Sequence, residues 1–191
     1  MADTGDDLLP EQRCHPNRSG STVEGTDMKQ VPAGEEGRRE LREAYAVFPS
    51  GVVGLCAVVD GVPVGMAASS FVSVSLDPPL VAVCVRWASE TWPRLADRPR
   101  IGVSVLGESH DSAARRLAAA TGDRFEGLTL NTTGDGAVLI EGASAWLECS
   151  VDSVIPAGDH QLVLLRIEAF DVRPAVEPLV FQSSTFRRLS A

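Results

Sequence analysis

Residues 65–79 read Gly-Met-Ala-Ala-Ser-Ser-Phe-Val-Ser-Val-Ser-Leu-Asp-Pro-Pro. In the second half of this stretch apolar residues alternate with serine, and a period of two predicts a strand with one polar face. The two prolines end the strand, because proline has no N–H to donate to a ladder. Upstream, Asp60-Gly61 separates two apolar runs and is typical of a tight hairpin turn. The sequence therefore predicts antiparallel strands over 51–59 and 62–76.

Further apolar runs extend this pattern along the chain. They predict strands over 80–87, 101–106, 145–152 and 161–172, and short final strands over 179–181 and 185–189. Helices are predicted over 38–48, where apolar residues follow helical spacing, over 89–96, and from Ser109 or Asp111 to Ala120. The Gly- and Thr-rich residues 121–136 predict a loop. Because the strands follow one another instead of alternating with helices, the expected fold class is mainly β: an antiparallel β-barrel with peripheral helices.

Composition and charge narrow the class of partner. The chain has 191 residues, of which 44% are apolar and 23% charged, which is typical of a globular protein with a sizeable core. The net charge of −9 argues against nucleic acid or an anionic membrane as partner. Residues 1–37 hold eight acidic and three basic side chains, which leaves −4 for the other 154 residues. We therefore expect a disordered acidic tail over 1–37 and one folded domain over 38–191.

The cysteines and the apolar segments bear on the cellular compartment. Cys14, Cys56, Cys84 and Cys149 lack the spacing of a metal site, and the last three lie in apolar runs, which predicts buried free thiols. The tail lacks the apolar core of a secretory signal. The longest uncharged stretch, between Asp60 and Asp77, contains proline, glycine and serine, so it does not predict a membrane span. We expect a cytoplasmic protein without a metal.

The common catalytic motifs do not occur in the sequence. It contains no phosphate-binding P-loop, no G-x-G-x-x-G dinucleotide fingerprint and no G-x-S-x-G nucleophile elbow. From the residues alone, the interpretation ends at a soluble β-rich domain with a polar, serine-rich loop region.

The stretch at 65–79 resembles the flavin reductase family, the FMN-binding split-barrel reductases of two-component monooxygenases. Other segments resemble the family in the expected order: Phe-Pro-Ser-Gly-Val at 48–52, residues 80–85, Ser89 with Thr91, Asp-Arg-Phe-Glu-Gly at 123–127, residues 145–149, Gly-Asp-His at 158–160 and Pro-Leu-Val-Phe at 178–181. The resemblance covers residues 40–189. It implies a Greek-key, FMN-binding split barrel.

The resemblance also implies a function. A member of this family would be an NAD(P)H:flavin oxidoreductase that transfers hydride from NADH to FAD or FMN. It would supply free reduced flavin to a partner monooxygenase, and it would form a homodimer. NADH is favoured over NADPH because no obvious arginine cluster awaits a 2′-phosphate, apart from Arg187 and Arg188. FAD is slightly favoured over FMN.

The site residues follow from the same resemblance. Small alanines let backbone approach a flavin ring, serines offer hydroxyls, and Ser89 with Thr91 would hold a phosphate. His160 would position the nicotinamide, without acid–base work, because hydride transfer needs only stacking and orientation. Ser104 stands where the family often has asparagine, and Ala67 where it often has threonine. The implied cofactor-binding residues are Ser50, Ala67, Ala68, Ser69, Ser70, Cys84, Val85, Arg86, Ser89, Thr91, Ser104 and His110, and those for NADH are Arg124, Phe125 and His160.

Structural interpretations of the same residues stay open. The serines at 69 and 70 can face water on an edge strand, Ser89 and Thr91 can cap a helix, and His160 can be a hairpin-tip residue without a role. Other functions stay open as well: a flavin-binding barrel without turnover, an enzyme of the same fold that retains FMN and reduces another substrate, or a heme- or pyridoxine-type use of the barrel. An absorbance spectrum would separate them.

Overall fold

A single curved antiparallel sheet dominates the structure. The computed structural model describes residues 27–189, so most of the predicted acidic tail lies outside the described residues. The sheet has the strand order β3-β2-β6-β9-β10-β5-β4, and all of its pairings are antiparallel. Its strands are β2 (Val53–Val59), β3 (Val62–Ala68), β4 (Val72–Leu76), β5 (Pro79–Arg86), β6 (Ile101–Val105), β9 (Ala145–Ala157) and β10 (His160–Val172). The prediction of a mainly β fold is confirmed.

The predicted hairpin at Asp60-Gly61 is present between β2 and β3. Both turn residues have positive φ, 52° and 79°, as a two-residue hairpin turn of the favoured type requires. The single strand expected over 62–76 is two strands, however, because the chain leaves the ladder at residues 69–71. This interruption lets β3 and β4 lie at opposite ends of the sheet order.

Two small sheets complete the β structure. One contains β1 (Ser50–Gly51), β11 (Val180–Gln182) and β12 (Thr185–Arg187), and the other contains β7 (Leu130–Thr132) and β8 (Val138–Ile140). The prediction of loop throughout 121–136 is wrong at β7. The strand β8 has no counterpart in the prediction, because three apolar residues are too few to establish a period.

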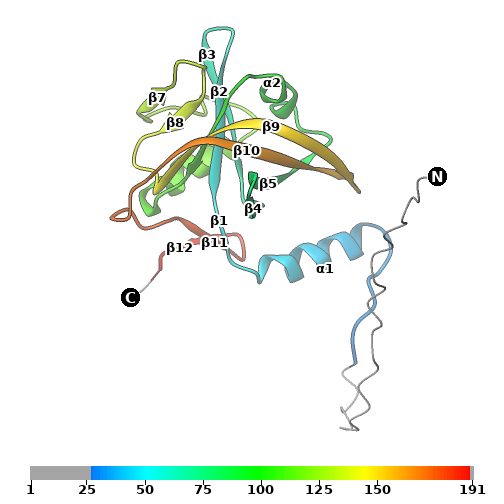
Figure 1. The fold of residues 1–191 in the computed structure, drawn as a ribbon. Coiled ribbons are helices and arrows are strands. Elements are labelled where there is room, and N and C mark those ends of the chain that lie inside the picture. The colour runs from blue at the N-terminus through cyan, green and yellow to red at the C-terminus, as the bar shows by residue number, and fades with distance from the viewer. Residues whose placement is uncertain (1–26, 190–191) are drawn as a thin grey trace, which may run out of the picture.

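The helices are short and peripheral, and they differ in how they pack. They are α1 (Gly34–Ala46), α2 (Trp92–Ala96), the 3-10 turn η1 (Glu108–His110) and α3 (Asp111–Ala118). On α3 the apolar side, including Leu117, is buried against the sheet. On α1 only Gly37 is buried, and Tyr45 near its end is 69% exposed. Figure 1 shows α1 lying beside the barrel at its lower edge, and Leu41 and Ala44 on its apolar side face residues 29–32 of the preceding segment.

The core has two parts, one inside the sheet and one under α3. The first contains Leu55, Val83, Val103 and Leu165, and the second packs β2 and β8 against α3. Cys56 and Cys149 are buried free thiols, and burial raises the pKa of both to about 12. Cys84 is exposed, so the prediction that it is buried is wrong. Within residues 27–189, no helix has the length and apolar character needed to cross a membrane.

Candidate active site

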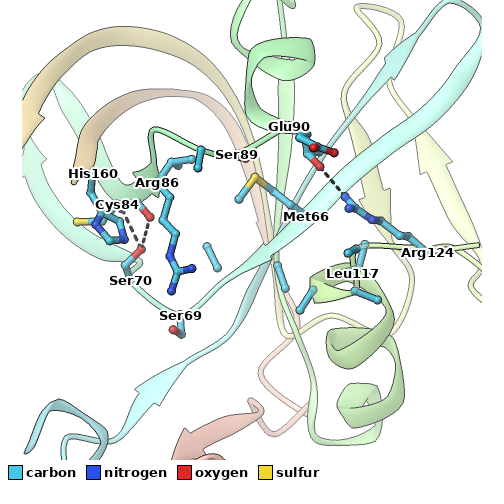
Figure 2. A pocket seen from close by; sticks show the side chains of 18 residues that line it. Met66, Ser69, Ser70, Cys84, Arg86, Ser89, Glu90, Leu117, Arg124 and His160 are labelled. Atoms are coloured by element: carbon cyan, nitrogen blue, oxygen red, sulfur yellow. Dashed lines mark hydrogen bonds between the residues drawn. The ribbon is translucent and has the colours of Figure 1, made fainter. Parts of the chain in front are cut away.

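A cleft of about 690 Å³ opens beside the end of β3 (Figure 2). It is lined by residues 66–70, 84–86, 88–91, 117–120, 124 and 160. These residues come from β3, from β5 and the turn after it, from the end of α3, and from the start of β10. The structure therefore brings most of the sequence-predicted site residues to one place: Ala67, Ala68, Ser69, Ser70, Cys84, Val85, Arg86, Ser89, Thr91, Arg124 and His160.

The outward-facing residues of β5 form one wall of the cleft. Burial alternates along the end of this strand: Val83 and Val85 are buried, whereas Cys84 and Arg86 are exposed. Cys84 and Arg86 both line the cleft, and both lie near His160 in Figure 2. The alanines at the end of β3 leave room opposite this wall. A slot with small residues on one side and an open strand on the other suits a flat ring.

Ser70 joins the two walls. Its hydroxyl donates to the carbonyl oxygen of Cys84 over 3.1 Å and accepts from the N–H of Cys84 over 2.8 Å. In the ladder between β4 and β5, Val72 pairs with Ala82. If this ladder continued by two residues, Ser70 would pair with Cys84. The side chain therefore supplies the bonds that backbone would otherwise make at the gap between β3 and β4. Ser70 thus fixes the wall of the cleft, and Ser69 beside it is exposed.

Ser89 and Thr91 line the opposite end of the cleft. Ser89 Oγ accepts from the N–H of Trp92, the first residue of α2, over 3.1 Å, whereas Thr91 occupies the N-cap position and its side chain makes no capping bond. Thr91 Oγ1 accepts from Arg124 Nη1 over 2.6 Å, and the same Nη1 donates to the carbonyl oxygen of Gly65 over 2.9 Å. Each hydroxyl uses its oxygen as an acceptor and retains its own proton for an anion. Capping and phosphate binding are therefore compatible here.

His160 is held by its neighbour in the turn between β9 and β10. Its Nδ1 lies 2.7 Å from Asp159 Oδ1, and this hydrogen bond lowers the pKa of the Asp159 carboxyl. Because a carboxylate only accepts, Nδ1 must carry the proton. In the neutral ring Nε2 then carries no proton and can accept a hydrogen bond. His160 is opposite Arg86 in the ladder, which places it in the cleft wall.

Four predicted site residues do not reach the cleft. Ser50 lies in β1 opposite Phe181, and Phe125 lines a neighbouring pocket. Ser104 is fully buried and accepts from the N–H of Ile140 over 2.9 Å. His110, expected at the surface or on a flavin, is 9% exposed.

The position of His110 has a structural explanation. Its Nδ1 accepts from the N–H of Gly107 over 3.1 Å, and burial lowers its pKa. A neutral imidazole that joins backbone segments is thus the role that the structure supports. The prediction of a flavin contact is not supported at Ser50, Ser104 or His110.

Replacing Ser104 separates its structural role from the predicted cofactor role. In Ser104→Ala the buried N–H of Ile140 loses its partner, and we expect the free energy of unfolding to fall by about 1–3 kcal/mol. Flavin affinity should stay unchanged. Urea unfolding and a flavin titration measure the two quantities, with the exposed Ser109→Ala as control. Weaker flavin binding at unchanged stability would contradict this assignment.

Several cleft residues have no counterpart in the sequence prediction. They are Met66, Ala88, Glu90 and residues 117–120. The Ala-Ala-Ala run at 118–120 is the one available signal, because small residues at a helix end permit close approach of a ligand. Over the described part of the chain, no cluster of three or more His, Cys, Asp or Glu side chains is arranged to hold a metal ion.

Comparison with known proteins identifies relatives of the chain. Residues 45–190 match the family model described as flavin reductase like domain. The chain is 39% identical over 151 residues to the actinorhodin polyketide dimerase of Streptomyces coelicolor, over 78% of this chain and 85% of that protein. It is 35% identical over 140 residues to HsaB, the reductase subunit of a flavin-dependent monooxygenase of Mycobacterium tuberculosis, over 73% of this chain and 75% of that protein.

A probable flavin reductase of Rhizobium meliloti is 36% identical over 134 residues, and the chain spans 43% of that protein. Among solved structures, the NADH:FAD oxidoreductase SgcE6 of Streptomyces globisporus, in complex with NAD and FAD fragments, matches with a TM-score of 0.77. The identity is 36%, over 85% of this chain and 98% of that chain.

Proposed function

The chain belongs to the flavin reductase like domain family, and on that premise we propose that it reduces FAD or FMN with NADH and delivers the reduced flavin to a partner monooxygenase. The observation that carries this proposal is the cleft itself. Small residues of β3, the open face of β5, the hydroxyls of Ser89 and Thr91, and His160 all line one hollow of about 690 Å³. A relative that is the reductase subunit of a monooxygenase supports the partner.

Different residues of the cleft would bind the two ligands, flavin and NADH. The walls around Ala67 and Cys84 would hold the flavin ring, and the hydroxyls of Ser89 and Thr91 would donate to its phosphate. His160 Nε2 would accept from the carboxamide N–H of nicotinamide. The reaction moves hydride from nicotinamide to flavin N5, and the chain contributes stacking, orientation and exclusion of water.

The decisive experiment is NADH oxidation with FAD, FMN and riboflavin in turn. We expect flavin-dependent loss of NADH absorbance, with flavin that leaves the protein on dialysis. Absence of any flavin-dependent rate, with NADH and with NADPH, would overturn the proposal. Bound flavin without turnover would favour a non-catalytic barrel, and yellow colour retained through dialysis would favour an enzyme that keeps its FMN.

Replacing His160 should affect the nucleotide more than the chemical step. In His160→Ala we expect the KM for NADH to rise about tenfold while kcat changes less than about threefold. His160→Gln retains an amide that can bond to the carboxamide, so it should recover part of the lost affinity. Steady-state kinetics at saturating flavin measure both constants. Unchanged NADH kinetics in His160→Ala would show that the residue is only a hairpin tip.

Preference for NADH is consistent with the surroundings of the cleft. Arg187 and Arg188 were the candidates for a 2′-phosphate, but neither lines the cleft. Arg188 Nε instead lies 3.5 Å from Glu108 Oε2. A relative described as an NADH:FAD oxidoreductase supports the same choice. We therefore propose NADH as the reductant.

A homodimer is the second part of the proposal, and exposed apolar side chains support it. Val72, Val74 and Leu76 are exposed on β4, the last strand of the sheet order, and Leu76 is 96% exposed. An apolar edge strand invites pairing with another chain. Phe48, just after α1, is 77% exposed as well. A second copy would cover these surfaces.

Solution mass tests the dimer. We expect the chain to sediment as a dimer and Leu76→Asp to sediment as a monomer at the same concentration, because a buried carboxylate without a partner opposes association. Val62→Asp, at an exposed apolar residue beside the hairpin turn, is the control and should stay dimeric. A monomeric parent chain would contradict the proposal.

A further inference from the structure

Arg86 lies in the wall of the cleft with a side chain that the fold does not use. It is the last residue of β5, it is exposed, and it lines the cleft opposite its ladder partner His160. Within residues 27–189, its guanidinium makes neither a hydrogen bond nor an ion pair. A guanidinium carries five N–H donors and a permanent positive charge. Arg86 can therefore direct both toward a ligand in the cleft.

Two arginines line the cleft, and they lie at its opposite ends (Figure 2). Arg124 is bonded to Thr91, at the end where the flavin phosphate is proposed to bind. The N–H of Ser89 donates to the carbonyl oxygen of Arg86 over 3.0 Å, so these two residues share a turn. In Figure 2, however, the side chain of Arg86 runs away from Ser89, on the side of His160. The charge of Arg86 is thus placed for the flavin ring, whereas that of Arg124 is placed for the phosphate.

No carboxylate among the described residues of the cleft neutralises Arg86. Glu90 is the only acidic residue in that lining, and it lies near Arg124 in Figure 2. Asp159 is close enough to be affected: the hydrogen bond and charge of His160 lower the pKa of its carboxyl, and the charge of Arg86 adds to this effect. The Asp159 carboxylate nevertheless bonds to His160 Nδ1 and does not line the cleft. The ring end of the cleft therefore keeps an uncompensated positive charge.

Hydride transfer changes the charge of the flavin ring. The C–H bond at C4 of the nicotinamide breaks and an N–H bond forms at flavin N5, so two electrons and one proton move together. The nicotinamide becomes a cation, and the neutral oxidised ring becomes an anion whose charge is spread over N1 and the C2 oxygen. A cation beside the ring therefore interacts more strongly with reduced flavin than with oxidised flavin.

We propose that Arg86 stabilises the negative charge that hydride transfer places on the flavin ring, and so favours reduced over oxidised flavin in the cleft. The inference rests on the proposed function, because it requires a flavin ring beside β5. The guanidinium gains a charge-assisted hydrogen bond only when the ring becomes an anion. An interaction that strengthens as the charge develops lowers the barrier to reduction, whereas a contact equal in both forms would only anchor the flavin.

Arg86→Gln tests the assignment, because glutamine keeps N–H donors and removes the charge. We expect the dissociation constant of reduced flavin, divided by that of oxidised flavin, to rise about tenfold at low ionic strength. For a two-electron couple this change lowers the midpoint potential of the bound flavin by about 30 mV. Arg86→Lys keeps the charge and should change the ratio less than about threefold. Arg100→Gln is the matched control, because Arg100 does not line the cleft and donates to its neighbour Pro99.

The measurements use the full chain. Flavin fluorescence gives the dissociation constant of oxidised flavin, and anaerobic equilibration with a redox dye gives the potential of the bound flavin. A lower potential in Arg86→Gln, restored in Arg86→Lys, supports the inference. An unchanged potential overturns it: equal weakening of both flavin forms would make Arg86 an anchor, and a change confined to the KM for NADH would make it a nucleotide contact. Absence of flavin binding by the parent chain overturns the proposed function as well, and so is distinguishable from these results.

Discussion

Gly102→Ala is expected to prevent stable folding of the barrel. Gly102 is the second residue of β6, which lies between β2 and β9, and a Cβ there would lie 2.1 Å from the carbonyl oxygen of Val138. That oxygen belongs to the backbone of β8, which Ser104 also holds through Ile140. Relief of the overlap would therefore separate β6 from β8. We expect a loss of about 3 kcal/mol or more, a large share of the stability of a domain.

Urea unfolding of the soluble protein measures this loss, and the soluble yield reports it if folding fails. Gly134→Ala is the matched control, because a Cβ at Gly134 meets nothing within 4 Å. It should leave the unfolding midpoint unchanged within error. Equal stability of Gly102→Ala and the parent chain would show that β8 can move away from β6, against the packing described above.

Gly102 also illustrates what the sequence can and cannot predict about the fold. The hairpin turn at Asp60-Gly61 depends only on neighbouring residues, because two residues with positive φ suffice to turn the chain there. The close approach of β8 to Gly102 is not local, since the two segments are about 36 residues apart, as Ser104 and Ile140 are. In the sequence Gly102 is one glycine within a strand-like run. Strands could therefore be predicted, whereas the packing of β8 could not.

The same distinction applies to the site. Residues within the quoted stretch, such as Ala67 and Ser70, were predicted because the family pattern is contiguous there. The structural roles of these residues could not be predicted. The hydroxyl of Ser70, for example, bonds to the backbone of Cys84, which is 14 residues away and on another strand. Ser104 and His110 do not line the cleft and bond to backbone instead, because a polar residue in the sequence does not show whether its partner is a ligand or buried backbone. Burial decides that question.

Cys84→Trp is expected to abolish flavin turnover while the fold survives. The side chain of Cys84 is exposed and Cys84 lines the cleft, so an indole there displaces no core residue. It would instead occupy the space between β5 and the alanines of β3, where the flavin ring is expected. We expect kcat/KM for flavin to fall about 100-fold or more, a loss of about 3 kcal/mol in transition-state binding.

Cys84→Ser separates the volume of this side chain from its chemistry. The hydrogen bonds at this position are made by the backbone of Cys84 to Ser70, so a serine should preserve them and keep turnover within about threefold. Urea unfolding should give similar midpoints for both variants, which would attribute the lost activity of Cys84→Trp to the filled cleft. A large loss in Cys84→Ser would mean that the thiol takes part in the reaction. Full activity in Cys84→Trp would place the flavin elsewhere, and the proposed cleft would be wrong.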